Sequence, residues 1–370
     1  MATHLKRIQG EEAVENAANV WQGRRVFITG HSGFKGGWLS LWLARRGAVV
    51  RGYSIDPSTD PNLYTIASIP SVVDDVHGDV RDYSALEKSM VEFAPEVVFH
   101  LAAQPIVVRS YAEPLTTYST NVMGTVHVME ALRKTPSVRA VVGITTDKVY
   151  QNQEWIWPYR ETDPLGGHDP YSASKACAEI VSAAYRSSYF PVSEFEKHQV
   201  LIATVRAGNV IGGGDWAAYR LVPDLVRSFS AGKPVLIRRP SATRPWQHVL
   251  EPITGYTMLA EKLLARKTAF ATSFNFGPGY DDVWPVERIA SKVAQLWGEG
   301  ARWERDSAPA PHEDRFLQLD ASRARSELGW RLKLRTESAL EWSIAWYRAW
   351  KDGKDMKAFT WKQIEEYEKL

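Results

Sequence analysis

The chain has 370 residues, of which 44% are hydrophobic and 24% are charged, a composition typical of a folded globular protein of about two domains. Lys and Arg number 45 against 43 Asp and Glu, and the net charge of +2 excludes a large basic field for nucleic acid or an anionic membrane. The single cysteine, Cys177, excludes an intrachain disulfide and a zinc site built from several cysteines, and we predict no metal site.

The N-terminal segment carries Glu11, Glu12 and Glu15 where a signal peptide would need an apolar centre, so we expect a polar leader at residues 1–20. No uninterrupted apolar run reaches about 18 residues, the length needed to cross a membrane. Together with the single cysteine, this pattern favours a cytoplasmic protein.

From residue 25 onward, short apolar runs alternate with helical patterns. We predict strands at 25–29, 48–53, 71–77, 96–101, 139–145 and 198–206, and helices at 34–46, 83–93, 116–133 and 171–189. Strands that are apolar on both faces and alternate with helices are typical of an α/β fold with a doubly wound parallel (Rossmann) sheet.

After Gly208 the pattern is interrupted by glycines and prolines, with helices still predicted at 285–296 and 337–350. These features predict a smaller, mainly helical C-terminal substrate lobe. We therefore expect a dinucleotide-binding domain at 21–207 and a substrate-binding lobe at 208–370. The two are interleaved, because residues 205–210 serve both.

A glycine-rich turn follows the first predicted strand, with Gly30, Gly33 and Gly36 leading into a helix. Such glycines allow a tight turn, close approach of backbone N–H groups to a pyrophosphate, and close packing of helix on strand. Asp56 lies twenty residues beyond Gly36, where an acid would bind the ribose and favour NAD over NADP. Arg51 leaves NADP open, and a mere tight turn is the alternative interpretation.

A tyrosine and a lysine, Tyr171 and Lys175, lie four residues apart on one face of a predicted helix. A cation beside a phenol stabilises the phenolate, which can take a proton from an alcohol while a hydride leaves. Alone, this spacing is common on surface helices. After a dinucleotide turn and a strand ending in Thr146-Asp147-Lys148, it predicts catalysis.

A family resemblance rests on six longer motifs: Gly30–Gly36, Phe99–Gln104, Tyr118–Thr125, Thr146–Lys148, Val205–Trp216 and Arg244–Val249. From about residue 21 to 350 the chain resembles the CDP-glucose 4,6-dehydratase family of the extended short-chain dehydrogenases/reductases. The resemblance implies a lyase that oxidises CDP-glucose at C4 with NAD, eliminates water across C5 and C6, and returns the hydride to C6.

The resemblance also implies the catalytic roles. Tyr171 would be the base at C4, Lys175 its electrostatic partner and nicotinamide-ribose anchor, and Thr146 a donor to the C4 oxygen. Asp147 would be the acid at C6 and Lys148 the base at C5. Many sugar-nucleotide dehydratases have glutamate in place of Lys148, and a lysine acts as a base only when neutral, so stabilisation of an enolate is the alternative.

The binding residues implied by the resemblance form two sets. Cofactor contacts would come from Gly30, Ser32, Gly33, Phe34, Lys35, Gly36, Asp56, Asp79, Val80, Leu101, Ala102, Ala103, Tyr171 and Lys175. Substrate contacts would come from Gln104, Asn121, Asn209, Arg220, Leu221 and Arg244. Leu101–Ala103 could equally be sheet core, and Asn121 a helix amide bound to a neighbouring carbonyl.

Tryptophan is abundant, with 15 residues, and Trp216 and Trp246 are placed either to flank the site or to pack in the core. We interpret His248 and His312 as structural or rim residues.

Two other functions stay open at this point: a sugar-nucleotide 4-epimerase, or a dinucleotide-sensing protein without catalysis. The nucleotide base is indicated only by the resemblance. The family also implies a homo-oligomer paired through helices 116–133 and 171–189, and a role in deoxysugar synthesis for a surface polysaccharide such as lipopolysaccharide O-antigen.

Overall fold

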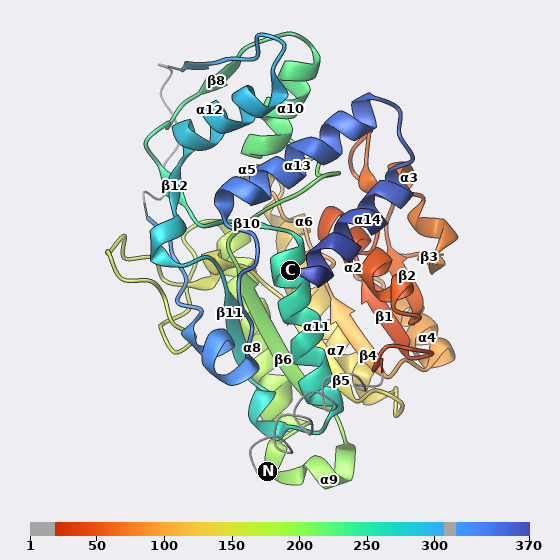
Figure 1. Cartoon of the computed structure of the whole chain (residues 1–370). Helices are drawn as coiled ribbons and strands as arrows, with labels where there is room; N and C mark the ends of the chain where they lie inside the picture. Colours follow the sequence, from red (N-terminus) through yellow and green to blue (C-terminus); the bar gives the residue numbers. More distant parts are fainter. Residues whose placement is uncertain (1–18, 307–315) are drawn as a thin grey trace, which may run out of the picture.

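The computed structural model describes residues 19–306 and 316–370, so most of the predicted leader and His312 lie outside the described part. At its centre is a seven-stranded parallel sheet in the order β11-β6-β5-β4-β1-β2-β3 (Figure 1). Its strands are β1 (Arg25–Thr29), β2 (Val49–Ser54), β3 (Asp74–His77), β4 (Val97–His100), β5 (Ala140–Ile144), β6 (Leu201–Ala207) and β11 (Ser273–Phe276). The predicted doubly wound Rossmann sheet is confirmed.

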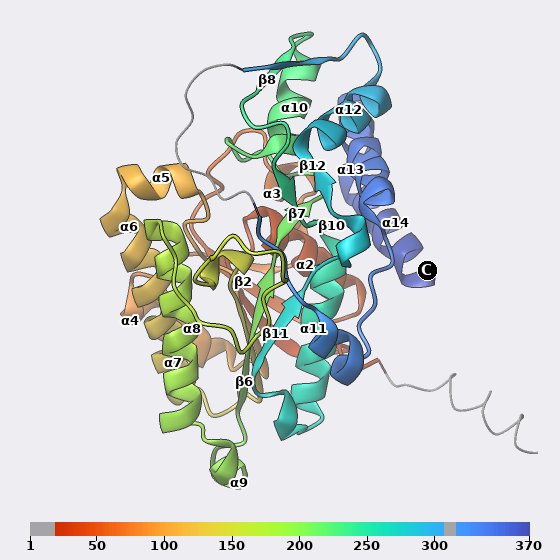
Figure 2. The same cartoon turned by 90° about the vertical axis from the view of Figure 1, so that its left-hand side faces the viewer.

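Helices cover both faces of this sheet, as Figure 2 shows. On one face lie α4 (Tyr83–Phe93), α7 (Gly124–Arg133) and α8 (Pro170–Ser188), and on the other lie α2 (Phe34–Arg45) and α11 (Leu250–Leu264). Alternate residues of β1 enter different cores: Phe27 packs with the first helix layer, and Val26 and Ile28 pack with the second. The two-sided burial explains why β4, β5 and β6 are buried along their whole length.

Several elements differ from the sequence prediction. The strand predicted at 198–206 is β6, which begins at Leu201, because Phe195–His198 forms a short helix. The predicted helix 116–133 is divided into α6 (Pro114–Tyr118), a π-helical turn (Ser119–Met123) and α7. The third strand begins at Asp74, because Ile69–Ser71 forms a 3₁₀ turn. The seventh strand, β11, was not predicted; it lies within the glycine- and proline-rich region and pairs in parallel with β6.

The C-terminal part adds helices α10 (Leu221–Ser230), α12 (Val286–Trp297), α13 (Thr336–Lys351) and α14 (Met356–Lys369). Its short strands are β7 (Asn209–Ile211), β8 (Val235–Ile237), β9 (Thr243–Arg244), β10 (Trp246–His248), β12 (Trp284–Pro285) and β13 (Trp303–Arg305). Short helices elsewhere are α3 (Leu63–Ile66), α5 (Val107–Ala112) and α9 (Phe195–His198). Both α11 and β11 lie beyond residue 208 in the sequence but belong to the layers of the central sheet. The predicted domain border at 207/208 therefore stays a prediction.

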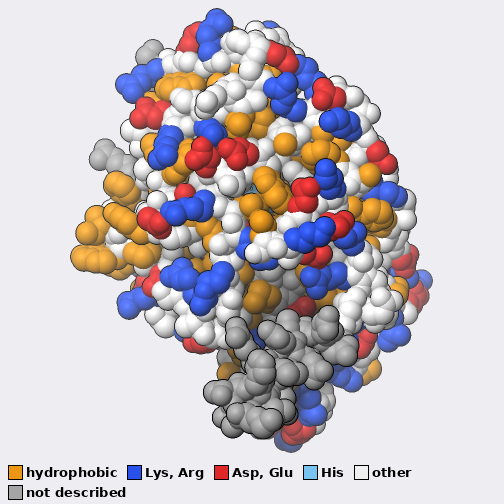
Figure 3. All heavy atoms as spheres, viewed as in Figure 1, with side chains coloured by type: hydrophobic (Ala, Val, Ile, Leu, Met, Phe, Trp, Pro, Cys, Tyr) orange, Lys and Arg blue, Asp and Glu red, His pale blue; other side chains and the backbone are white. Residues whose placement is uncertain are grey.

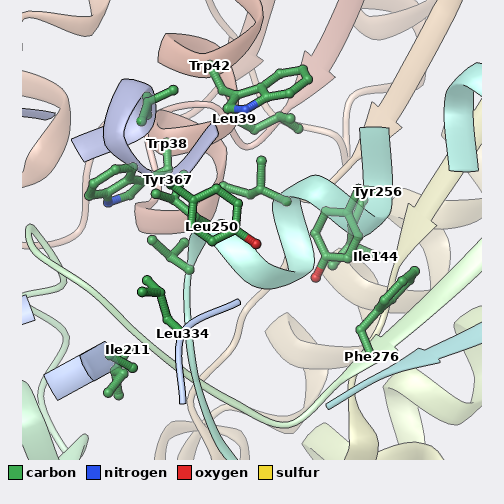
Figure 4. Close-up of a cluster of buried hydrophobic side chains, with 14 of the residues drawn as sticks. Trp38, Leu39, Trp42, Ile144, Ile211, Leu250, Tyr256, Phe276, Leu334 and Tyr367 are labelled. Atoms are coloured by element: carbon green, nitrogen blue, oxygen red, sulfur yellow. The ribbon is translucent and has the colours of Figure 1, made fainter. Parts of the chain in front are cut away.

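Buried tryptophans join the C-terminal helices to the sheet domain (Figure 4). The indole of Trp38 on α2 donates to the carbonyl of Gly213 at 2.9 Å. A Cβ atom on Gly213 would lie 2.0 Å from the ring of Trp346 on α13, so only glycine fits here. The loop after β7 is therefore held between an N-terminal and a C-terminal helix.

The surface agrees with the near-neutral charge. Acidic and basic side chains are interspersed on the face in Figure 3, with no large field of one sign. Of the helices that the structure describes, none has the length and apolar character of a membrane span.

The last helix, α14, is attached through a buried carboxyl group. Glu251 on α11 accepts hydrogen bonds from the Leu334 amide at 2.7 Å and the Tyr367 hydroxyl at 2.9 Å. Burial raises the pKa of Glu251 to about 7, although these donors act in the opposite direction. A carboxyl group with a folded-state pKa above its unfolded value stabilises the fold fully at low pH and loses this contribution as pH rises through the folded value.

We therefore expect Glu251→Gln to gain stability relative to the parent protein between pH 5 and pH 8. Thermal unfolding midpoints measured at both pH values for both proteins would test this. Parallel changes in the two proteins would contradict the assigned role of Glu251.

Candidate active site

The glycine turn joins β1 to α2 at the carboxyl edge of the sheet. Gly30 has a φ of +78°, and a Cβ atom there would lie 2.7 Å from the Ala102 amide nitrogen. At Gly36 a Cβ atom would lie 2.1 Å from the Gly30 carbonyl oxygen. No described side chain caps the first turn of α2, which begins at Phe34. The turn thus leaves open backbone N–H groups and a close approach for an anion.

The predicted ribose acid lies at the next strand end. Asp56 follows β2, and its carboxylate is 83% exposed and 2.9 Å from His77 Nδ1. Arg51, considered above as a partner for a 2′-phosphate, is instead bound to Asp74 at 2.6 Å and to the Ser89 carbonyl at 3.1 Å. This arrangement favours a free ribose hydroxyl over a phosphate beside Asp56.

Other predicted cofactor residues surround the same edge. The Ser32 hydroxyl donates to the Ile55 carbonyl, and Asp79 binds Arg81 at 2.6 Å. Val80 is buried, and its carbonyl accepts a bond from His127 at 2.8 Å. Leu101–Ala103 follow β4 and are partly buried, and the Leu101 amide donates to the Thr29 carbonyl at 3.0 Å.

Asn121 and Gln104, both predicted to bind substrate, are engaged within the protein. Asn121 is 1% exposed; it accepts from the Gln104 amide at 2.8 Å and donates to the Gln104 carbonyl at 3.1 Å and to Ser174 Oγ at 2.8 Å. The Gln104 side chain binds Ile106 and Thr117. The π-helical turn thus uses its asparagine to tie the segment after β4 to α8, and substrate contact by these two residues stays a prediction.

Tyr171 and Lys175 lie at the start of α8, whose first turn is capped by Asp169. Lys175 Nζ donates to the Ile144 carbonyl at 2.8 Å. Burial, and secondly the nearby Lys35, lower the pKa of Lys175 to about 7. Burial raises the pKa of Tyr171 to about 12, while the Thr146 hydroxyl and the Arg220 guanidinium act to lower it.

The Thr146-Asp147-Lys148 turn follows β5 and faces this pair. Thr146 Oγ1 donates to Asp147 Oδ1 at 2.9 Å, and Asp147 is 4% exposed. Burial raises the pKa of Asp147, against the lowering effect of Lys148, Thr146, Arg244 and Lys35. Lys148 is half-buried and lines a cavity of about 760 Å³ together with Tyr111, Tyr150 and His168. A carboxyl group with a raised pKa is suited to donate a proton.

The remaining predicted substrate residues converge on the same place from the C-terminal part. Arg220 comes just before α10, Leu221 is its first residue, and Asn209 is the first residue of β7. Arg220 lies close enough to Tyr171 to influence its pKa, and Arg244 close enough to influence that of Asp147. The structure thus places these cations close to the predicted catalytic residues.

Comparison with known proteins agrees with this geometry. A model of the GDP-mannose 4,6 dehydratase family matches residues 27–342. The chain belongs to this family. A CDP-glucose 4,6-dehydratase of Salmonella typhimurium is 49% identical over 349 residues, which are 94% of this chain and 97% of that relative. The family resemblance predicted from the motifs is confirmed.

Two solved structures, one of a dehydratase and one of an epimerase, have a fold similar to that of this chain. Bacillus anthracis dTDP-glucose 4,6-dehydratase in complex with NAD has a TM-score of 0.73 at 22% identity, covering 90% of this chain and 100% of that one. Thermotoga maritima UDP-glucose 4-epimerase with UDP-glucose has a TM-score of 0.75 at 20% identity, covering 88% and 99%. The fold is common to dehydratases and epimerases, so the site residues must distinguish them.

Two polar residues that hold side chains of the candidate site in place, Asp215 and His31, were not predicted from the sequence. Asp215 binds Arg220 Nη1 at 2.8 Å, and its carbonyl accepts the Tyr347 hydroxyl at 2.5 Å. His31, inside the glycine turn, is bound to Asp75 at 2.6 Å. Both lie within the quoted motifs. Arg220 is five residues from Asp215, but Tyr347 and Asp75 are distant in sequence from their partners, so motif position was the available signal.

Trp216, Trp246 and His248, by contrast, are packed rather than aimed at ligand. Trp216 contacts Tyr347 and Trp350 with ring centroids 5.2 and 4.6 Å apart, and Trp246 is 5% exposed. His248 is fully buried between Trp38 and Trp342, which agrees with a structural role.

Proposed function

We propose that the chain is an NAD-dependent CDP-glucose 4,6-dehydratase, a hydro-lyase that forms CDP-4-keto-6-deoxy-D-glucose. The observation that carries this proposal is the placement of an acid with a raised pKa, Asp147, directly beside Thr146 and opposite Tyr171. The 49% identity to a protein named CDP-glucose 4,6-dehydratase supports the substrate. Sequence position alone would not separate this function from epimerisation.

The residues present fit a bound NAD. Gly30 and Gly36 leave a cradle that a Cβ atom would fill, and Asp56 lies beyond the second strand, where a ribose acid is needed. The set proposed to hold the cofactor is Gly30, Ser32, Gly33, Phe34, Lys35, Gly36, Asp56, Asp79, Val80, Leu101, Ala102, Ala103, Tyr171 and Lys175. When bound, NAD would supply reversible hydride transfer beside Tyr171 and Lys175.

Tyr171 removes the C4 hydroxyl proton. Its phenolate is disfavoured by burial, and the Thr146 hydroxyl and the Arg220 guanidinium act against that cost. The role proposed for Lys175, four residues along the same helix, is to add to this effect when it is protonated. The single Thr146 hydroxyl proton, which goes to Asp147 Oδ1 in the structure, is donated to the C4 oxygen when substrate is bound, and the protonated Asp147 carboxyl then donates to Thr146 Oγ1. A ketone at C4 then acidifies the proton at C5.

Asp147 protonates the C6 hydroxyl as it leaves, and Lys148 removes the C5 proton from the neighbouring position. The diphosphate is held by Arg220 and Arg244, since guanidinium groups bind phosphate oxygens in pairs. Asn209 and Leu221 line the same side, with Gln104 and Asn121 behind the sugar. These contacts are proposals for the substrate-binding set.

We expect Lys148→Met to reduce the rate of solvent deuterium incorporation at C5 by about 10²-fold, because the variant lacks the C5 base. The measurement is the deuterium content of the sugar by mass spectrometry after incubation in D₂O. Lys88→Met, which changes a lysine 75% exposed on α4, is the matched control. Unchanged incorporation in Lys148→Met would overturn the base assignment and leave the lysine as an enolate stabiliser.

The test of the proposed function is incubation with CDP-, dTDP-, UDP- and GDP-glucose, each with added NAD or NADP. A 4-keto-6-deoxy product from CDP-glucose with NAD is the expected result. If a product forms only from another sugar nucleotide, that sugar nucleotide is the substrate instead of CDP-glucose. If a 4-epimer forms without a keto product, the reaction is epimerisation instead of dehydration. Absence of turnover with every substrate, with NAD still bound, would favour a sensing protein.

We also propose that the protein works as a homodimer in the cytoplasm. Four apolar side chains are exposed on or beside helices α6 and α8: Leu115 on α6 (86%), Met123 in the π-helical turn (47%), Ile180 on α8 (58%) and Tyr189 just after α8 (47%). Pairing with a second copy would cover them. Its product would enter a reaction sequence that consumes 4-keto-6-deoxy sugars, as in deoxysugar synthesis for a surface polysaccharide such as lipopolysaccharide O-antigen. Sedimentation or light scattering gives the oligomeric state.

A further inference from the structure

Three consecutive residues at the end of β5 are joined to three residues of α8. The Ile144 carbonyl accepts from Lys175 Nζ at 2.8 Å, and the Thr145 hydroxyl donates to Glu179 Oε1 at 2.5 Å. Thr146 acts on Tyr171 through its hydroxyl. Tyr171, Lys175 and Glu179 are four residues apart, so they form one row on the helix. The end of β5 and helix α8 are thus connected by three successive side-chain contacts.

Glu179 is the residue of this row that makes the largest number of side-chain hydrogen bonds, to Thr145, Thr204 and Arg206. It is 4% exposed and binds Arg206 with two bonds, from Nε at 3.0 Å and from Nη2 at 2.9 Å. The Thr204 hydroxyl donates to its other oxygen at 2.7 Å. Burial alone would raise the pKa of Glu179, but Arg206 and the two hydroxyls lower it below its usual value. An ionised carboxylate only accepts hydrogen bonds, so both threonines must donate to it.

Arg206 is itself held from further sides. Its Nη1 donates to the Tyr150 hydroxyl at 2.8 Å and to the Glu161 carbonyl at 3.2 Å, and Tyr150 donates to Asn275 at 2.8 Å. The network therefore spans β5, β6, β11 and α8 and contains no group from the proposed reaction. Loss of one hydroxyl would leave the Glu179–Arg206 pair in place.

We propose that Thr145 is a positioning residue, whose bond to Glu179 fixes the end of β5 against α8 and so holds Thr146 and Asp147 opposite Tyr171. The inference rests on the proposed function of those three residues. One buried hydrogen bond contributes little to the net stability of a fold. A displacement of about 1 Å in a catalytic group, however, can cost about 10²-fold in rate.

The test compares Thr145→Val with Thr204→Val. Each change removes one hydroxyl donor to the same carboxylate and keeps the side-chain shape, but only Thr145 is the neighbour of Thr146. We expect Thr145→Val to lower kcat by about 10- to 100-fold with KM changed less than about twofold, and Thr204→Val to leave both within about twofold. Thermal unfolding midpoints should fall by similar amounts in the two variants. Thr145→Ser, which keeps the hydroxyl, should restore kcat.

A second readout distinguishes positioning from stability. With substrate deuterated at C4, the kinetic isotope effect should increase in Thr145→Val, because the hydride-transfer step becomes slower, and stay unchanged in Thr204→Val. Equal losses of kcat in both variants, or an unchanged kcat in Thr145→Val at a lowered midpoint, would overturn the inference. The assays use whichever sugar nucleotide the parent protein converts. An error in the proposed substrate would thus be detected in the assay of the parent protein. An error in the role of Thr145 would be detected only when the variants are compared with the parent.

Discussion

Replacing Tyr171 with phenylalanine is expected to lower kcat for the dehydration of CDP-glucose by about 10³-fold, within the range that general acid–base groups contribute. The phenol is 9% exposed, and burial raises its pKa to about 12, so no bulk base can take its place at C4. The substituted ring keeps the shape of the site and the row formed with Lys175. Substrate affinity should therefore change less than about twofold.

The matched control for this change is Tyr185→Phe, which removes a phenol from the same helix. Tyr185, further along α8, donates to Glu130 of the neighbouring helix α7 at 2.5 Å. Its loss should lower thermal stability without affecting turnover. Product formed by Tyr171→Phe at more than a tenth of the parent rate would contradict the assignment of the C4 base.

Asp147→Asn is expected to lower kcat by about 10²-fold or more while C5 still exchanges its proton with solvent. The amide cannot donate a proton to the departing C6 hydroxyl, but Tyr171 and Lys148 are unchanged. CDP-glucose recovered from D₂O should therefore carry deuterium at C5. In Tyr171→Phe it should not, since no ketone forms at C4 to acidify that position.

The pH dependence gives an independent check on Asp147. Burial raises the pKa of its carboxyl group, which keeps the protonated, proton-donating form to higher pH. The parent kcat should fall as pH rises through that value, and Asp147→Asn should lose this limb of the profile. Asp74→Asn, at a surface pair with Arg51, is the control. Loss of C5 exchange together with product in Asp147→Asn would show that the residue acts before elimination.

Much of the sheet could be predicted because periodicity is a local property. β1 and α4 have the predicted bounds, since a short apolar strand and an amphipathic helix capped by Asp82 are complete signals in themselves. β11 could not be predicted from so few residues, because its burial depends on pairing with β6. The same holds for α14, which is attached through Glu251 on a helix distant in sequence.

The candidate site divides in the same way. The four-residue spacing of Tyr171 and Lys175 predicted that both lie on one face of a helix. The glycines of the turn after β1 predicted a binding place for a pyrophosphate. The proximity of Lys35 to Lys175 and of Arg244 to Asp147 depends on how distant segments pack, and no spacing in the sequence contains it. The role of Asn121 in joining the segment after β4 to α8 likewise required its partners to be located.

Two tryptophan side chains, Trp38 and Trp346, lie next to Gly213 and are natural fluorescent groups in this part of the molecule. Trp38 binds the carbonyl of this glycine and Trp346 fills the space over it, while Asn209 and Asp215 lie on either side of the same short loop. Any movement of the loop toward a ligand must change the surroundings of at least one of these rings. We therefore expect a ligand that moves this loop to change the intrinsic tryptophan fluorescence of the unlabelled protein.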